Sequence, residues 1–350
     1  MPSLPLWDKR SLTVRGESAL FTGPGAVRLL FPAQEILKVY NPVLNEVYQP
    51  QVHYTHTPGT PFIYPVPGSG ICGLFDGGIF PDPATAKVYP SPNANAIPGG
   101  PDGKLLLFGE GSFFAEKQIV VDYRAVEGSS FPRLPVLRPG QLPRTCARLK
   151  AGDGTLKCTV IGDSISAGFN ATEFVKTPPY EPPYFIQFVR ALREKFGTFV
   201  SASNCAVNGS GSRAAFNITS QWLEPEIDLL VIAYGMNDLS GMEADEFREA
   251  VRAIIKAKNA RHPETEFLLV APMMRNPLWG KDVSEKSAAF AAALHTLAAE
   301  NCAVADCYWL WKKVTEVKSF YDITGNGVNH PNDYGHKLYA RTLTELFREI

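Results

Sequence analysis

Hydrophobic and polar positions follow two different patterns along the chain. In the first 150 residues, short apolar runs are separated by turn signals such as Gly23-Pro24-Gly25 and Gly99-Gly100. Runs rich in β-branched and aromatic residues between such turns are typical of strands. Five strands are expected on this basis, at Ala26–Phe31, Glu46–Tyr48, Pro61–Tyr64, Lys104–Phe108 and Gln118–Tyr123. Without helical periodicity beside them, they predict an all-β sandwich of the jelly-roll kind over residues 1–150.

The pattern changes near residue 150. Residues 129–155 are irregular, apart from a short helix expected over Leu142–Leu149, and we interpret them as a connector. Beyond them, strands are expected at Cys158–Ile161, Phe199–Ala206, Asp228–Tyr234, Phe267–Val270 and Ala303–Ala305. Helices are expected at Tyr184–Phe196, Ala244–Ala260, Ser284–Asn301 and Asp333–Phe347. This alternation predicts an α/β domain over residues 151–350, with a parallel sheet covered on both faces.

Composition and charge narrow the class of protein. The net charge is −1 and the basic residues form no stripe, so we expect no nucleic-acid partner. No apolar run approaches the ~20 residues that a membrane span needs. The first residues lack the apolar core of a signal peptide, so a cytoplasmic protein without a membrane partner is expected. The six cysteines lack the paired spacing of a metal site.

Small polar residues cluster in four stretches, most of them directly after an expected strand. These stretches are Gly162-Asp163-Ser164, Asn204–Gly211, Gly235-Met236-Asn237-Asp238 and Asn326–Asn332. Because the carboxyl ends of strands in an open α/β sheet meet at one crevice, the four stretches are expected to converge. They would bring together a hydroxyl, a glycine N–H, an amide and an imidazole. That set supplies the nucleophile, the oxyanion donors and the general base of acyl transfer.

In this order, the four stretches resemble the blocks of the SGNH (GDSL-type) hydrolase superfamily over about residues 155–350. Ser164 stands at the nucleophile position, Gly209 at the glycine of the second block, Asn237 at the asparagine of the third and His330 at the final histidine. The resemblance implies a flavodoxin-like three-layer sandwich and hydrolysis of an acyl ester, often O-acetyl. The backbone N–H groups of Ser164 and Gly209 and the amide of Asn237 would form the oxyanion hole. A β-sandwich ahead of this domain is similar to some carbohydrate esterases, which implies an acylated sugar as substrate.

One position departs from the family pattern. The family usually has an aspartate three residues before the histidine, and that residue is Gly327 here. Three groups could orient the His330 imidazole instead. They are Asp322, Asn326 if the loop holds one inserted residue, and a backbone carbonyl, which would leave a Ser–His dyad. A neutral group would stabilise the imidazolium less than a carboxylate does.

Together these features predict a serine esterase that removes a short acyl group, O-acetyl above all, from a carbohydrate or a related alcohol, without a metal or cofactor. Two alternatives stay open. One is a lipid esterase or thioesterase, whose acyl pocket the loop Thr177–Tyr184 would line. The other is a non-catalytic glycan-binding protein, which only the departure at Gly327 favours.

Overall fold

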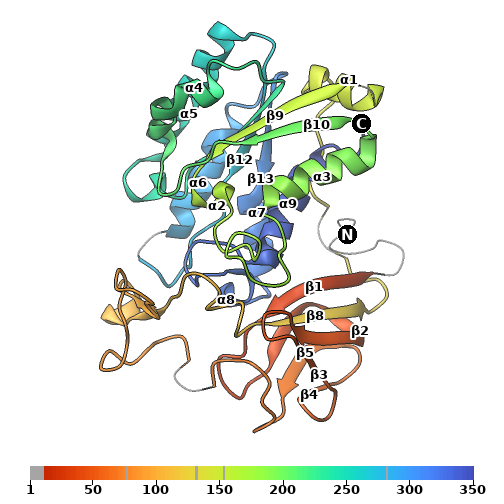
Figure 1. Ribbon diagram of the computed structural model, residues 1–350, viewed down its shortest axis with the longest axis vertical. Helices are drawn as coiled ribbons and strands as arrows, with labels where there is room; N and C mark the ends of the chain where they lie inside the picture. Colours follow the sequence, from red (N-terminus) through yellow and green to blue (C-terminus); the bar gives the residue numbers. More distant parts are fainter. Residues whose placement is uncertain (1–11, 76–77, 131–132, 153, 281–282) are drawn as a thin grey trace.

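The chain is described here from a computed structural model, which places residues 12–75, 78–130, 133–152, 154–280 and 283–350. Figure 1 shows an antiparallel β part below and an α/β part above it. The α/β fold with an antiparallel β-rich part ahead of it, as expected from the sequence, is confirmed. The division into two domains at residue 150 stays a prediction. Helix α1 (Pro143–Ala151) spans that position and packs with the α/β part.

Six strands of the N-terminal part form one sheet in the order β1-β8-β2-β5-β4, with β3 paired to β2. Their bounds are Thr13–Ala19 (β1), Val27–Asn41 (β2), Glu46–Tyr48 (β3), Tyr54–His56 (β4), Thr60–Pro65 (β5) and Ile119–Ala125 (β8). A separate ladder joins β6 (Ala96–Ile97) to β7 (Leu106–Leu107). Each expected strand overlaps one of these. Strand β2 runs past the expected end at Phe31 because its second half pairs with β8 and β3.

The α/β part is built on five parallel strands in the order β10-β9-β11-β12-β13. Their bounds are Thr155–Gly162 (β9), Phe199–Asn204 (β10), Leu229–Ala233 (β11), Glu266–Ala271 (β12) and Cys302–Asp306 (β13). Numbered along the chain, this order is 2-1-3-4-5, which is the flavodoxin-like topology. Successive strands are added on one side of β9 and then on the other, so the strand order reverses between β9 and β11. The loops that follow these two strands therefore border the crevice where such sheets bind ligands.

Helices cover both faces of this sheet. Their bounds are Ser164–Ala167 (α2), Tyr184–Phe196 (α3), Thr219–Trp222 (α4), Ala244–Arg261 (α5), Val283–His295 (α6), Cys307–Thr315 (α7), Phe320–Ile323 (α8) and Asp333–Leu346 (α9). Three 3-10 helices are Pro101–Gly103 (η1), Ser212–Ile218 (η2) and Asp238–Ser240 (η3). Helix α3 packs with α9, and α5 packs with α6 (Figure 1). The sheet and these two helix pairs make up the expected three layers.

Helix α6 ends at His295, whereas the alanine-rich pattern predicted a helix to Asn301. The connector accounts for the difference. The amide of Gln141 donates to the backbone oxygens of Ala299 and Cys302, and the Leu142 N–H donates to the oxygen of Glu300 at 2.7 Å. Backbone oxygens at the far end of this stretch thus accept from a distant segment, while residues 296–298 form local turn hydrogen bonds. Sequence periodicity does not reveal such a competition.

A buried ion pair joins the two parts of the molecule. Lys318 Nζ lies 2.7 Å from Glu17 Oε1 of β1, and the side chains of both residues are fully shielded from solvent. The Tyr123 hydroxyl donates to the other Glu17 oxygen at 2.7 Å. Lys318 also donates to the backbone oxygen of Arg28 at 2.9 Å. Because buried charges are tolerated only when they are paired and hydrogen-bonded, this network fixes β1 against the segment that leads into α8.

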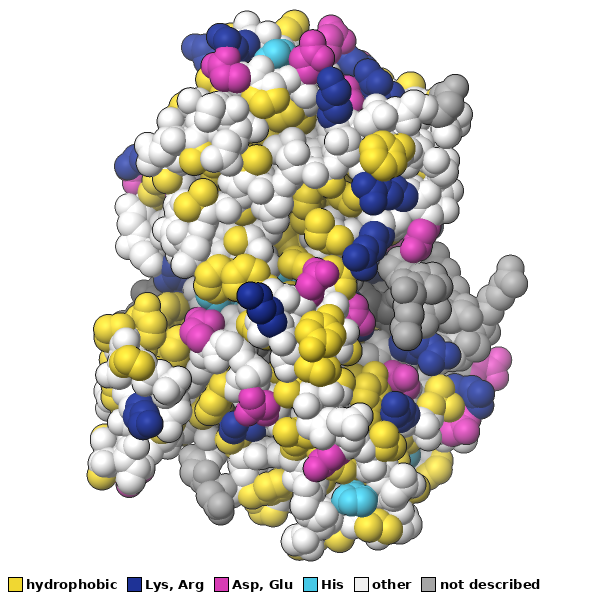
Figure 2. Space-filling model, viewed as in Figure 1, with side chains coloured by type: hydrophobic (Ala, Val, Ile, Leu, Met, Phe, Trp, Pro, Cys, Tyr) yellow, Lys and Arg dark blue, Asp and Glu magenta, His cyan; other side chains and the backbone are white. Residues whose placement is uncertain are grey.

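Charged side chains of both signs are interspersed over the face of the molecule that Figure 2 shows, with apolar side chains between them. None of the helices in the described ranges has the length and apolar character that a bilayer crossing requires. Within the same ranges, no three His, Cys, Asp or Glu side chains are grouped as a metal site.

We expect the substitution Lys318→Met to lower the free energy of unfolding by about 3–5 kcal/mol, because it leaves the Glu17 carboxylate buried without its cation. Urea denaturation measures this loss. The double variant Glu17→Gln, Lys318→Met should recover part of it. Lys157→Met is the matched control, since it breaks the exposed Lys157–Glu226 pair and should cost less than about 1 kcal/mol. Equal losses for the two single variants would contradict a joining role for Lys318.

Candidate active site

The predicted nucleophile and base lie in contact. Strand β9 ends at Gly162, and the Asp163 carboxylate caps the short helix α2 by accepting from the Ile165 N–H at 3.0 Å. This turn places Ser164 Oγ 2.9 Å from His330 Nε2, although 166 positions separate the two residues. Ser164 is 3% exposed and His330 is 7% exposed. The first and last predicted stretches therefore form a buried hydroxyl–imidazole pair.

Asn170 accepts the proton on the other ring nitrogen of His330. The Asn170 amide nitrogen donates to the backbone oxygens of Gly111 at 3.3 Å and Gly325 at 3.0 Å. Its Oδ1 is thereby turned toward His330 Nδ1, at 3.0 Å. These partners assign the proton to Nδ1 and leave Nε2 free to accept from the serine. A neutral imidazole in this tautomer is ready to act as a base.

Asn326 and Glu110 complete the surroundings of His330 Nδ1. Asn326 Oδ1 accepts from the backbone N–H groups of Val328, Asn329 and His330, each at 3.0 Å. The Asn326 amide nitrogen donates to Asn329 Oδ1 at 2.9 Å and to Glu110 Oε1 at 3.2 Å, which uses both of its hydrogens. Its 3.0 Å approach to Nδ1 is therefore not a donation to the imidazole. Glu110 Oε1 lies 3.5 Å from the same ring nitrogen.

The expected role of Asp322 is corrected by its position in the structure. Asp322 Oδ1 accepts from the Leu20 N–H at 2.8 Å, and Oδ2 accepts from the Ser319 N–H at 3.0 Å. Lys318 Nζ is 3.6 Å from the same carboxylate. Asp322 thus caps α8 and holds β1 in place, and the groups at His330 Nδ1 are Asn170, Asn326 and Glu110. Backbone and cation partners close to Asp322 decide where its carboxylate points.

Gly327, where the family usually has an aspartate, has no room for a side chain. It adopts a φ of +82°, which favours glycine. A Cβ at this position would lie 2.7 Å from the backbone oxygen of Leu107 in β7, and 2.9 Å from the rings of Phe114 and Tyr321. The N-terminal part therefore fills the space that an aspartate would need. This packing explains the departure from the family pattern.

Gly209 and Asn237 lie on loops that are attached to the end of β9. The Val207 N–H and the Ser210 hydroxyl donate to the Gly162 oxygen at 2.9 and 3.1 Å. The Asn237 amide donates to the Ser210 oxygen at 3.0 Å. Gly209 has a φ of +72° and lies on the exposed side of its loop. The structure thus holds the second and third predicted stretches against the first.

Two more titratable residues lie close to the pair. Burial raises the pKa of Asp163 to about 7. Burial also lowers the pKa of His336 to about 4, so its imidazole is neutral. His336 Nδ1 accepts from the Tyr184 N–H at 3.3 Å, and Nε2 donates to the Phe169 oxygen at 3.1 Å. His336 is therefore a neutral packing residue beneath the site.

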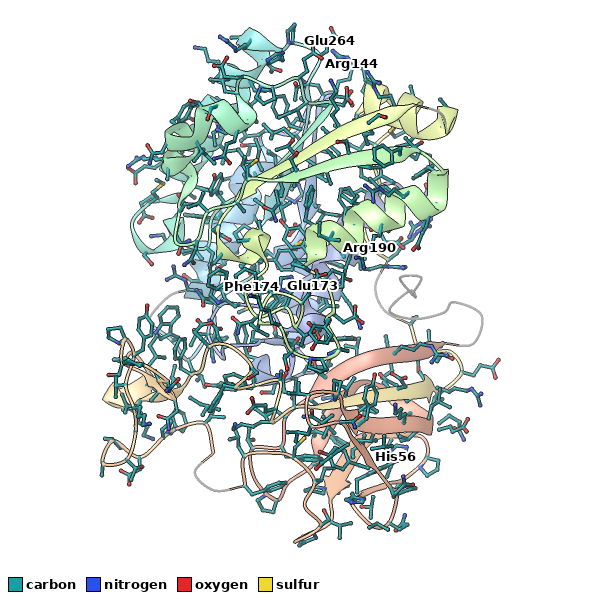
Figure 3. All side chains as sticks on the ribbon, in the orientation of Figure 1. His56, Arg144, Glu173, Phe174, Arg190 and Glu264 are labelled. Atoms are coloured by element: carbon teal, nitrogen blue, oxygen red, sulfur yellow. The ribbon has the colours of Figure 1, made fainter. Side chains whose placement is uncertain are left out.

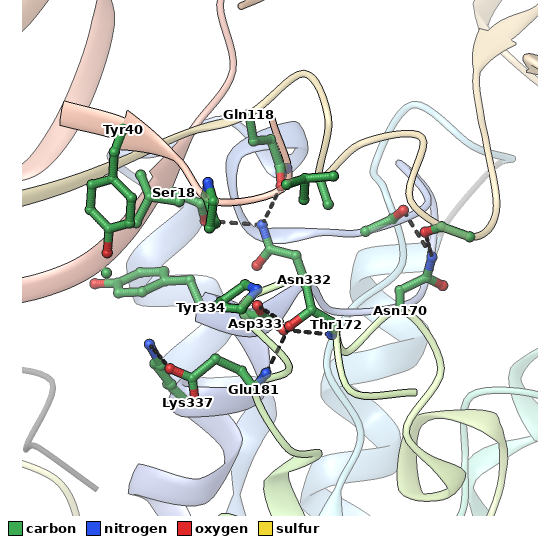
Figure 4. Close-up of a pocket in the computed structure, with 18 residues that line it drawn as sticks. Ser18, Tyr40, Gln118, Asn170, Thr172, Glu181, Asn332, Asp333, Tyr334 and Lys337 are labelled. Carbon is green, nitrogen blue, oxygen red and sulfur yellow. Dashed lines mark hydrogen bonds and ion pairs between the residues drawn. The ribbon is translucent and has the colours of Figure 1, made fainter. Parts of the chain in front are cut away.

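A cavity separates the two parts beside Asn170 (Figure 4). Several of its polar side chains pair with one another. Thr172 donates twice to Asp333, at 2.8 Å from both the N–H and the hydroxyl, and Lys337 pairs with Glu181 at 3.3 Å. Burial raises the pKa of Asp333 to about 7. These contacts attach the loop that carries Asn170 to the start of α9.

The same loop places aromatic rings beside the imidazole. The Phe169 ring centroid is 5.3 Å from that of His330, and the Phe174 centroid is 4.6 Å from that of Phe169. Figure 3 shows Phe174 and Glu173 at the level where the two parts of the molecule meet. The two aromatic rings form a wall next to the Ser164–His330 pair, which is almost wholly buried.

An open cleft with mixed polar and apolar lining lies beside the loop that carries Asn237. Arg275 donates to the Met236 oxygen and the Ser240 hydroxyl, and its guanidinium is 5.3 Å from the centroid of the Trp279 ring. The cleft has a volume of about 750 Å³, and its lining also includes Gly99, Glu243 and Lys286. An aromatic face among charged and hydroxyl groups suits a ligand rich in polar groups.

A parallel 2-1-3-4-5 sheet that carries a buried Ser–His pair at its switch point defines an α/β serine hydrolase. The GDSL-like lipase/acylhydrolase family model matches residues 160–338, and the chain belongs to this family. By its family, the chain is classed with lipases and acylhydrolases. The family resemblance expected from the sequence is confirmed.

Several solved structures are similar to this chain. A two-domain esterase active on acetylated mannans is 20% identical with a TM-score of 0.48, and the match covers 59% of this chain and 52% of that protein, about half its length. A G-D-S-L family lipolytic protein from Veillonella parvula is 17% identical with a TM-score of 0.44, covering 56% of this chain and 100% of the other. A mutant acetyl-xylooligosaccharide esterase from Geobacillus is 16% identical with a TM-score of 0.47, covering 56% and 96%. No curated protein matches the chain.

Sequence reasoning missed Asn170 and Glu110. Asn170 follows the nucleophile by six positions, and its left-handed φ of +61° suits an asparagine at a turn. That local signal gave no hint of contact with His330. Glu110 stands between two glycines in the N-terminal part. Nothing in the spacing connects it with residues of the α/β part.

We expect Gly327→Asp to destabilise the protein rather than restore a family triad. The left-handed φ and the clash with the Leu107 oxygen should together lower the free energy of unfolding by about 2–5 kcal/mol. Gly128→Asp is the matched control, since Gly128 has the same φ of +82° in open space. It should cost about 1–2 kcal/mol. Chemical denaturation of both variants measures the difference, and equal losses would refute the steric explanation.

Asp322→Asn and Asn170→Ala should separate stability from turnover. Asp322→Asn weakens the capping and docking bonds, so the free energy of unfolding should fall by about 1–3 kcal/mol while kcat stays within about threefold. Asn170→Ala removes the acceptor at Nδ1, and kcat should fall about 10–100-fold. Steady-state hydrolysis of a short ester and urea denaturation measure both effects. A folded Asp322→Asn variant with kcat lowered by about 10³ or more would show that Asp322 takes part in catalysis.

Proposed function

We propose that this enzyme is a serine esterase in which Ser164 and His330 remove a short acyl group, acetyl above all, from a carbohydrate or related polyhydroxylated alcohol. The observation that carries the proposal is the 2.9 Å contact between Ser164 Oγ and His330 Nε2 at the switch point of the sheet. The family membership supports ester hydrolysis. The acyl group and the alcohol are inferences from the surroundings of this pair.

The proposed reaction uses these groups in turn. Ser164 Oγ attacks the ester carbonyl carbon while His330 Nε2 takes the hydroxyl proton. The carbonyl oxygen gains negative charge, which the N–H groups of Ser164 and Gly209 and the amide of Asn237 stabilise. The Asn237 nitrogen carries a second hydrogen beyond the one that it gives to Ser210. His330 returns the proton to the departing alkoxide, and water then hydrolyses the acyl-enzyme through the same base.

Two features support the proposed substrate class. Ser164 and His330 expose little surface, and the Phe169–Phe174 wall lies beside them, which favours a small acyl group. The open cleft beside the Asn237 loop has a polar and aromatic lining that includes Arg275 and Trp279. Such a lining favours an alcohol with several hydroxyl groups over a lipid. Cytoplasmic location and the absence of nucleic-acid and membrane partners stay predictions.

Turnover of nitrophenyl acetate, butyrate and octanoate tests the proposal. We expect kcat/KM to fall as the acyl chain lengthens, and Ser164→Ala to lower kcat by at least about 10⁴-fold. Ser166→Ala is the matched control, since its buried hydroxyl contacts Tyr184 and the variant should keep most activity. Acetylated oligosaccharides then test the alcohol. A preference for octanoate would favour a lipid esterase, and undiminished turnover by Ser164→Ala would exclude Ser164 as the nucleophile.

A further inference from the structure

We propose that Glu110, a residue of the N-terminal part, supplies the negative charge that this enzyme places beside the catalytic imidazole. Glu110 then acts as a positioning residue through His330 and does not touch the reacting atoms. The inference rests on the proposed function, because it assigns a partner to the same base. It implies that the N-terminal part is a component of the active site.

The contacts of Glu110 support this role. Its Oε1 is 3.5 Å from His330 Nδ1, and the Asn326 amide donates to the same oxygen at 3.2 Å. Asn326 is itself held by three backbone N–H groups, so it fixes the carboxylate in place. The Gly109 N–H donates to the Asn326 oxygen at 3.3 Å and joins the two segments next to this contact. The carboxylate is thus held at a set distance from the ring although its side chain is 44% exposed.

The pKa of Glu110 is consistent with a permanent charge. Burial among its neighbours would raise the pKa, but the His330 ring beside the carboxylate and the Asn326 amide that donates to it outweigh this effect and bring the pKa below its ordinary value. Glu110 is therefore ionised over the whole pH range in which an imidazole titrates. A change of pH in that range cannot remove this charge, whereas a substitution does.

The packing at Gly327 indicates why the charge comes from this segment. The Leu107 oxygen occupies the space that a side chain on residue 327 would need. Three positions later, the same segment presents Glu110 to His330. One stretch of the N-terminal part thus excludes the family's usual aspartate and brings another carboxylate to the imidazole. The chemistry needs a charge near Nδ1, and it does not depend on which segment provides it.

The two functions of a triad acid are divided between two residues here. Asn170 accepts the Nδ1 proton at 3.0 Å and fixes the tautomer. Glu110 is slightly farther away and stabilises the imidazolium that forms when Ser164 gives up its proton. Among the described residues, the other titratable groups that act on this ring include Asp163, which is partly ionised near neutral pH, and His336, which is neutral. Glu110 is the carboxylate on the Nδ1 side.

The test compares pH profiles of kcat/KM and kcat for a short ester in the wild-type enzyme and in Glu110→Gln. We expect kcat to fall about 10–100-fold, less than for the loss of a complete triad acid, because Asn170 keeps the tautomer. The acidic limb of the profile should move to lower pH by about one unit, because the imidazole without its anion loses its proton more readily. KM should change little. A disturbance of structure alone would not produce this limb shift.

Two further variants sharpen the test. Glu110→Asp keeps the charge on a shorter side chain, so it should return the acidic limb close to the wild-type position and recover part of kcat. Glu127→Gln makes the same change of charge at an exposed position of the N-terminal part and should leave kcat and the limb unchanged. A Glu110→Gln enzyme with unchanged kcat, or with reduced kcat and an unmoved limb, would overturn the inference.

Labelling of Ser164 by an organophosphorus inhibitor distinguishes failure of this inference from failure of the proposed function. Its rate reports on the nucleophile and base whatever the natural ester is. If the wild-type enzyme neither reacts with the inhibitor nor turns over esters, the proposed function is refuted, and so is the role of Glu110. A reactive wild type whose pH dependence of labelling is the same in Glu110→Gln would overturn the role of Glu110 alone.

Discussion

The arrangement of this enzyme depends on the buried ion pair between Lys318 and Glu17. A charge in a protein interior is stable only beside its partner, so β1 has one favourable position against the chain that leads into α8. The same chain continues to Gly327 and His330. Gln118 and Asn332 add hydrogen bonds across this contact, at 2.7–2.9 Å. Once the two parts are joined in this way, the positions of Leu107 and Glu110 beside the catalytic loop follow.

The parallel sheet supplies the rest of the site by its topology. Ser164 and Asn237 follow β9 and β11, the two strands between which the strand order reverses. Side chains that follow neighbouring parallel strands meet at one edge, and the loop of Gly209 is hydrogen-bonded to the end of β9. The proposed nucleophile and oxyanion donors therefore come from separate stretches that are not adjacent in the sequence.

In the arrangement proposed around His330, two residues share the functions of a catalytic acid. A hydrogen bond needs an acceptor close to Nδ1 and in a fixed direction, which Asn170 provides. Stabilisation of the imidazolium needs a negative charge within a few ångströms, but its direction matters less. Glu110 meets this weaker requirement from the edge of the site. In this proposal, two residues from different parts of the chain take over the functions of the carboxylate that is absent at Gly327.

The sequence by itself determined the elements and the order of the motifs. Apolar periodicity predicted α3 with its observed bounds and β11 to within a residue at each end, because these elements depend on local propensity and on a buried face. The four stretches predicted the contact of Ser164 with His330, since the ends of parallel strands must converge. The tertiary structure decided the end of α6, the length of β2 and the partners of His330. Asn326 and Glu110 are 216 positions apart, and only the docking of the two parts brings that carboxylate to the imidazole. No local pattern encodes such a contact, because its energy depends on surfaces that exist only after both parts have folded.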